Sequence, residues 1–179
     1  KDNGLDVQAG FFTTKIGTTF SKVAWTPTLS FLYYWGSGDT NATDGKNGTY
    51  DILFPLNHAY WGIIDNLSGQ NLNDIGLQAT VKPHAKFTGL AAMHWFNRTT
   101  TADTVYNVAG GPVATKAALA GNGNNIGQEL DLIGTYNYNP NFDVQAGYSW
   151  FWYGSALSGI PATAKGDATQ FYIQTSLRY

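Results

Sequence analysis

The sequence predicts an all-β fold, an antiparallel transmembrane β-barrel, and three observations support this prediction. Only 12% of the 179 residues are charged whereas 15% are aromatic, and no apolar run approaches the ~20 residues of a membrane-spanning helix. Segments in which apolar and polar residues alternate recur along the whole chain. The last of them, residues 171–179, ends on the aromatic Tyr179, as the final strands of bacterial outer-membrane barrels usually do.

Seven alternating segments are predicted to be strands, because successive side chains of a strand point to opposite faces. They span 5–16, 23–36, 72–82, 86–98, 127–138, 142–153 and 171–179, each close to the roughly 9–11 residues with which a tilted strand crosses a bilayer, or slightly longer. The apolar faces are marked, in order, by Phe11, then Phe31 and Tyr33, Leu77, Met93 and Trp95, Leu130 and Leu132, Trp150 and Trp152, and finally Phe171 and Ile173.

The connections between these segments alternate strictly between short and long. The short ones are rich in Pro, Asn, Gly and other turn residues, and the long ones resemble the outer loops of membrane barrels. A soluble β-sandwich, which is the alternative, has no reason to collect its long loops at one end. The short connections are 17–22, 82–86 and 139–141, and the long ones are 36–71, 99–126 and 154–167.

The strand count predicts an incomplete barrel. If Tyr179 ends in the periplasm, seven strands place Lys1 on the outer side, whereas single-chain bacterial barrels have an even number of strands. We therefore expect residues 1–179 to be a single barrel domain that is incomplete on its N-terminal side. It would be the C-terminal part of a larger barrel, or would close with another chain, because an open edge is untenable in lipid.

Several motifs resemble the alginate export family in order and spacing over about residues 23–153. The resemblance implies a large β-barrel whose charged lumen passes an acidic polysaccharide without catalysis. The motifs are the stretch 25–39, Tyr50-Asp-Ile-Leu-Phe-Pro-Leu-Asn-His-Ala-Tyr-Trp-Gly-Ile-Ile-Asp65, Gln70-Asn-Leu-Asn-Asp74, Ala91-Ala-Met-His-Trp-Phe96, Val105-Tyr106, Gly127-Gln-Glu-Leu-Asp131 and Ala146-Gly-Tyr-Ser-Trp-Phe151.

Charged and polar residues on the faces opposite the apolar stripes are expected to line the lumen. The resemblance to alginate exporters implies a lumen rich in arginine and lysine, as anion selectivity requires. Here the assignable inward charges are Asp6, Asp74, Glu129, Asp131 and Asp143 against Lys82, Arg98 and Arg178, which leaves the solute's charge open. The candidates for solute contact are Asp74, Gln78, Lys82, His94, Arg98, Glu129, Asp131 and Arg178.

Two interpretations of the predicted ionic cluster remain open. His94 and Arg98 share a face, and Glu129 and Asp131 are on the next strand, so these groups either hold lumen side chains in place or form a constriction that touches solute. His58 either joins a loop that folds into the pore or packs within its own loop. The bulky aromatics are expected to face lipid, with Tyr136 and Tyr138 near the turns and Trp35, Trp95, Trp150 and Trp152 near the opposite strand ends.

No catalytic or metal site is predicted. Asp39 to Gly45 lacks the spacing and the closing glutamate of a calcium loop, and a hydrolase using Ser149 or His94 is the one catalytic alternative. The predicted function is a channel in the Gram-negative outer membrane that passes polysaccharide or another polar solute without a cofactor, in contact with outer-membrane lipid. The alternatives are a non-conducting structural or adhesive surface protein and a soluble carbohydrate-binding sandwich. Net charge −2 argues against nucleic acid.

Overall fold

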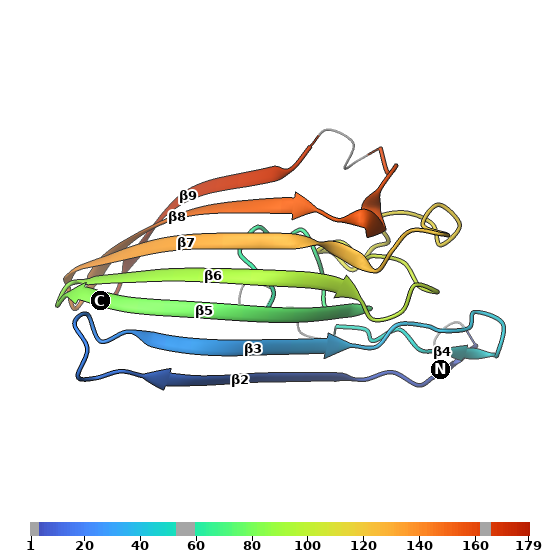
Figure 1. Cartoon of the computed structure of the whole chain (residues 1–179), viewed down its shortest axis with the longest axis horizontal. Coiled ribbons are helices and arrows are strands. Elements are labelled where there is room, and N and C mark those ends of the chain that lie inside the picture. The colour runs from blue at the N-terminus through green and yellow to red at the C-terminus, as the bar shows by residue number, and fades with distance from the viewer. Residues whose placement is uncertain (1–3, 53–59, 162–165) are drawn as a thin grey trace.

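The computed structural model describes residues 4–52, 60–161 and 166–179 and contains one seven-stranded antiparallel sheet (Figure 1). Each strand pairs with the next one along the chain, in the order β2-β3-β5-β6-β7-β8-β9. The strands are β2 (Phe11–Thr19), β3 (Thr28–Gly36), β5 (Leu72–His84), β6 (Phe87–Arg98), β7 (Asn125–Asn139), β8 (Phe142–Tyr153) and β9 (Ala168–Leu177). The all-β prediction is confirmed, but the sheet is open, with β2 and β9 at its edges.

The two ends of the sheet differ in their connections, as the sequence predicted. Short turns join β2 to β3, β5 to β6 and β7 to β8 at the end of the sheet where Tyr179 lies, which we call the turn end (Figure 1). Segments 37–71, 99–124 and 154–167 leave the other end, which we call the loop end. There β1 (Asp6–Val7) and β4 (Lys46–Asn47) form a two-residue parallel pair, and Ser155–Leu157 forms a 3-10 turn.

The start of the sheet differs from the prediction in boundaries and in phase. The segment predicted as one strand, 5–16, divides into β1 and β2, and β2 continues to Thr19. Phe12 and Ile16 pair with Trp35 and Phe31, so they share the apolar face and Phe11 lies on the opposite one. The even-numbered residues of β2 are apolar only at Phe12 and Ile16, too few to reveal the phase. Asp6, predicted to face the lumen, belongs to β1 and lies outside the sheet.

The ends of two other strands also shift. The second predicted strand, 23–36, begins only at Thr28, because residues 20–27 form a turn in which Trp25 (φ 68°) and Thr26 (φ 42°) are left-handed. Residues other than glycine rarely adopt this left-handed conformation, and it is incompatible with a β-strand. The last strand begins at Ala168, three residues earlier than predicted, and ends at Leu177.

The sheet is curved, and its two faces have opposite chemistry. The convex face carries exposed apolar side chains from every strand, with Ile16, Phe171 and Leu177 being 68%, 63% and 72% exposed. Trp35, Trp95, Trp150 and Trp152 lie on this face near the loop end, with Tyr136 and Tyr138 near the turn end, as predicted. Among the residues that the structure describes, no helix is long and apolar enough to span a membrane.

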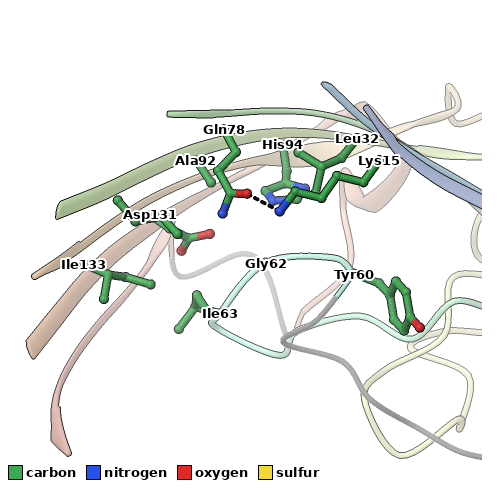
Figure 2. Close-up of a pocket in the computed structure, with 11 residues that line it drawn as sticks. Lys15, Leu32, Tyr60, Gly62, Ile63, Gln78, Ala92, His94, Asp131 and Ile133 are labelled. Carbon is green, nitrogen blue, oxygen red and sulfur yellow. Dashed lines mark hydrogen bonds between the residues drawn. The ribbon is translucent and has the colours of Figure 1, made fainter. Parts of the chain in front are cut away.

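The core lies on the concave face, at the loop end only. Trp61 and Leu67 come from the segment between β4 and β5 and are buried together with Leu72, Phe96 and Phe151 of the sheet. The Phe96 and Phe151 rings are stacked 5.8 Å apart. Figure 2 shows the segment around Gly62 beneath the curved strands. Residues 60–70, which we call the covering segment, bury the loop-end half of the concave face together with Val105, Leu119 and Leu157 of the other two long connections. The turn-end half is less buried.

Candidate functional site

The candidate site is the concave face, where the strands place most of the predicted solute-contact residues. Cross-strand pairing aligns Asp74 and Gln78 of β5, His94 of β6, and Glu129 and Asp131 of β7 on this face. Except for Gln78, these side chains are buried. Their contact with a solute stays a prediction, but their partners within the protein can be described one by one.

Asp74 and His94 form a close, buried pair near the middle of the sheet. Nδ1 of His94 lies 2.8 Å from Oδ2 of Asp74. The imidazole also stacks on Phe96, with ring centroids 5.5 Å apart, and Gly76, its cross-strand neighbour, leaves space for the ring. The hydrogen bond to Asp74 and the stacking on Phe96 together hold the imidazole in one orientation.

Glu129 attaches the covering segment to the sheet. Its Oε1 accepts hydrogen bonds from the backbone N–H groups of Ile63, at 2.6 Å, and Ile64, at 2.9 Å. Gly62 makes this approach possible, because its φ is +79° and a Cβ there would lie 2.4 Å from the same oxygen. One acceptor oxygen thereby satisfies two backbone donors of the covering segment. The carboxylate therefore holds residues 60–64 inside the concave face.

Arg98 does not join the predicted ionic cluster, which corrects the expectation that it would meet Glu129 and Asp131. Its guanidinium donates instead to the carbonyl oxygens of Asn122, at 2.8 Å, and Gly123, at 2.7 Å, and more weakly to two further carbonyls of the 99–124 loop. Asp131 accepts a hydrogen bond from Ser149 at 2.5 Å. Glu129 and Asp131 interact with each other through their side chains, and Asp131 also acts electrostatically on His94. These buried groups thus contact one another and the surrounding protein, which favours the structural interpretation for this half of the face.

The remaining predicted residues lie toward the turn end. Gln78 accepts a hydrogen bond from Lys15 of β2. Lys15 is not among the residues predicted to line the lumen, because the predicted phase of that strand places it on the apolar face with Phe11. Lys82 is exposed beside an irregularity in the pairing of β5 with β6. Arg178 pairs with Asp143 at 2.9 Å, and Ser149 and His94 have different partners, so they form no catalytic pair. His58 lies outside the described residues.

A small cavity separates the covering segment from the sheet (Figure 2). Its volume is about 120 Å3, and Lys15, Gln78, His94 and Asp131 line the side formed by the strands. Tyr60 and Ile63 line the side formed by the covering segment. The cavity is large enough for a few water molecules but not for a sugar chain to pass, so residues 60–64 would have to move for passage at this point.

No sequence pattern pointed to Asp103 in the 99–124 loop, a buried residue with several polar partners. Its Oδ2 accepts hydrogen bonds from the N–H of Asp39, at 3.0 Å, and the hydroxyl of Thr49, at 2.6 Å. Its Oδ1 accepts from the hydroxyl of Tyr106, at 3.1 Å, and lies 3.4 Å from Nζ of Lys116. No periodic pattern marks such a residue, because its partners come from two loops. This Asp103 cluster fixes the long loops to each other.

The described residues contain no group of three or more histidine, cysteine or carboxylate side chains that could hold a metal ion. The stretch 39–45, weighed as a calcium loop, forms local turns instead. Thr43 donates its N–H to Oδ1 of Asn41, at 3.1 Å, and Lys46 donates to Oδ1 of Asp44, at 3.0 Å. These are the ordinary turn contacts of Asn and Asp side chains.

The family comparison agrees with the resemblance that the motifs suggested and extends it. The model of the Alginate export family matches residues 3–170, which is most of the chain and more than the 23–153 expected from the motifs. The chain belongs to the alginate export family. A search of curated proteins found no significant match. The alginate export family is a transport family rather than a catalytic one, and membership suggests an export-related role at the bacterial outer membrane.

Proposed function

We propose that this chain forms part of an outer-membrane channel of the alginate-export type, which passes a polysaccharide or another polar solute without catalysis. The observation that carries the proposal is the chemical difference between the two faces of one sheet. The convex face exposes Ile16, Ile173 and Leu177, whereas the concave face carries carboxylates, amides and His94. Strands of transmembrane barrels alternate in this way between lipid and a polar lumen.

The open sheet requires additional strands for this function. β2 and β9 each have a neighbour on one side only, and backbone groups left unpaired in lipid cost several kcal/mol each. The channel would therefore close with an upstream segment of the same polypeptide or with another chain, and its convex face would contact outer-membrane lipid. The mass of the protein in detergent would distinguish self-association from a single longer polypeptide.

Conductance of the folded protein in planar lipid bilayers tests the channel directly. We expect discrete current steps after insertion, which heat-denatured protein added at the same concentration should not give. Circular dichroism of the same sample shows whether the sheet has formed. A β-folded, lipid-inserted protein that never gives current steps would contradict the channel.

The second candidate is a non-conducting surface protein that is anchored by the sheet, and the packing of residues 60–70 favours it. Replacing Glu129 by Ala removes the acceptor for two backbone N–H groups and should weaken attachment of the covering segment by about 2 kcal/mol. In a gated channel this raises the open probability, whereas Glu129→Gln, which keeps an acceptor oxygen, should have a smaller effect. If neither wild type nor Glu129→Ala conducts, the second candidate is favoured.

A further inference from the structure

The concave face contains a second, larger cavity toward β9, whose lining is chemically distinct from that of the small cavity. Its volume is about 410 Å3, within the usual range of small-molecule sites. None of the described residues that line it is charged. They are three amides, a phenol and two aliphatic side chains: Gln145, Gln170, Gln174, Tyr172, Ile63 and Ile133.

The polar groups of this cavity are partly fixed and partly free. Tyr172 lies over Gly147, its cross-strand partner, where a Cβ would come within 2.2 Å of the ring, and its hydroxyl donates to Oε1 of Gln145 at 2.9 Å. Gln145 in turn donates to Thr135 at 3.1 Å. In contrast, Oε1 of Gln170 is shielded from solvent and has no hydrogen-bond partner among the described residues. Gln170 therefore has an unused acceptor beside the cavity.

From this lining we infer that the cavity is a subsite for an uncharged, hydroxyl-rich glycan. The inference deepens the proposed channel function and rests on it. Amide side chains both donate and accept hydrogen bonds, as sugar hydroxyls do, while Tyr172, Ile63 and Ile133 offer apolar surface to the C–H groups of a sugar ring.

The neighbouring charges argue against a polyanionic glycan. Asp131 lies beside Ile133 on β7, and Asp143 lies beside Gln145 on β8. Asp143 is paired with Arg178 at 2.9 Å, whereas Asp131 accepts from the hydroxyl of Ser149 and also interacts with Glu129 and His94. A uronate carboxylate in the cavity would find no cation among the described lining residues, while Asp131 lies on the adjoining part of β7 and would repel it.

Calorimetric titration of the full chain in detergent micelles tests the subsite, with maltohexaose as the uncharged probe and a hexa-uronate of equal length as the anionic one. We expect maltohexaose to bind and the hexa-uronate to bind at least tenfold more weakly. The double variant Gln170→Met/Gln174→Met should weaken maltohexaose binding about tenfold, the effect of losing two hydrogen bonds. Gln128→Met makes the same change on the convex face and should leave binding unaltered.

Tyr172→Phe, which removes one hydroxyl only, provides a mild variant if the double variant fails to fold. We expect it to weaken binding about threefold. Equal or tighter binding of the hexa-uronate, or unaltered maltohexaose binding in the folded concave-face variants, would overturn the subsite. Binding by a protein that forms no pore would leave the subsite intact and remove the channel function, whereas pores without glycan binding would remove only the subsite.

Discussion

The loop-end and turn-end halves of the concave face use polar residues in opposite ways. At the loop end, Asp74, Arg98 and Glu129 are buried, and each is committed to a partner within the protein. Toward the turn end, Gln78 is half-buried and Gln174 is exposed, and both line cavities that separate the sheet from Ile63 of the covering segment. The difference shows that a polar residue on the inward side of a strand is not by itself evidence for solute contact. The covering segment decides which polar groups remain available.

The largest expected loss of stability comes from the apolar core of the loop-end half, which the turn-end half lacks among the described residues. Phe96→Ala removes a fully buried ring that is stacked on Phe151 and should lower the free energy of unfolding by about 4 kcal/mol. Ile133→Ala, at a half-buried position of the turn-end half, should cost about 1–2 kcal/mol. Urea unfolding followed by tryptophan fluorescence measures both values. Equal losses would show that the two halves are packed alike.

A somewhat smaller effect is expected for the Asp103 cluster. Asp103→Ala leaves the hydroxyls of Thr49 and Tyr106 without their acceptor and should destabilise the loops by about 3 kcal/mol. Limited proteolysis should then cleave the long loops faster while the strands stay protected. Asp103→Asn keeps one carbonyl oxygen and serves as the control, with an intermediate cleavage rate. Unchanged cleavage in Asp103→Ala would mean that the loops are held by other contacts.

The same cluster should be sensitive to alkaline pH. Burial, reinforced by the nearby Asp103 carboxylate, raises the pKa of Tyr106 from 10.0 to about 12. Because the phenol ionises more easily in the unfolded chain, its contribution to stability is complete below pH 10 and is lost as the pH rises toward 12. The unfolding midpoint of the wild type should therefore fall more steeply over this range than that of Tyr106→Phe. Parallel curves would contradict this assignment.

The smallest effect is expected at the turn end. Arg178→Gln breaks the 2.9 Å contact with Asp143, but the Arg178 side chain is largely exposed. Solvent-exposed ion pairs contribute about 0–1 kcal/mol, so the unfolding free energy should change by less than about 0.5 kcal/mol. Raising the salt concentration should remove any difference in unfolding free energy between the wild type and Arg178→Gln. A loss above 2 kcal/mol would show that the turn end is as tightly packed as the loop end.

Sequence reasoning succeeded for features that depend on neighbouring residues and failed where distant segments decide. The alternation located five of the seven strands to within three residues at either end, placed Trp150 and Trp152 on the apolar face, and separated long from short connections. The predicted phase of β2 is wrong. Phe11 and Phe12 are adjacent, so either one could mark the apolar face, and only the pairing with β3 decides which one does. Sequence reasoning also expected Arg98 beside Glu129, because sharing a face does not specify which way a long side chain turns.

The sequence by itself determined the all-β class, the strand periodicity and the family, because alternation and motif spacing are local properties of the chain. Only the tertiary structure decided that residues 60–70 and the other long connections cover half of the concave face and that Asp103 joins separate loops. It also showed that uncharged amides, rather than the predicted ionic residues, line the larger cavity. These features depend on contacts between residues far apart in the chain, for which strand periodicity contains no information.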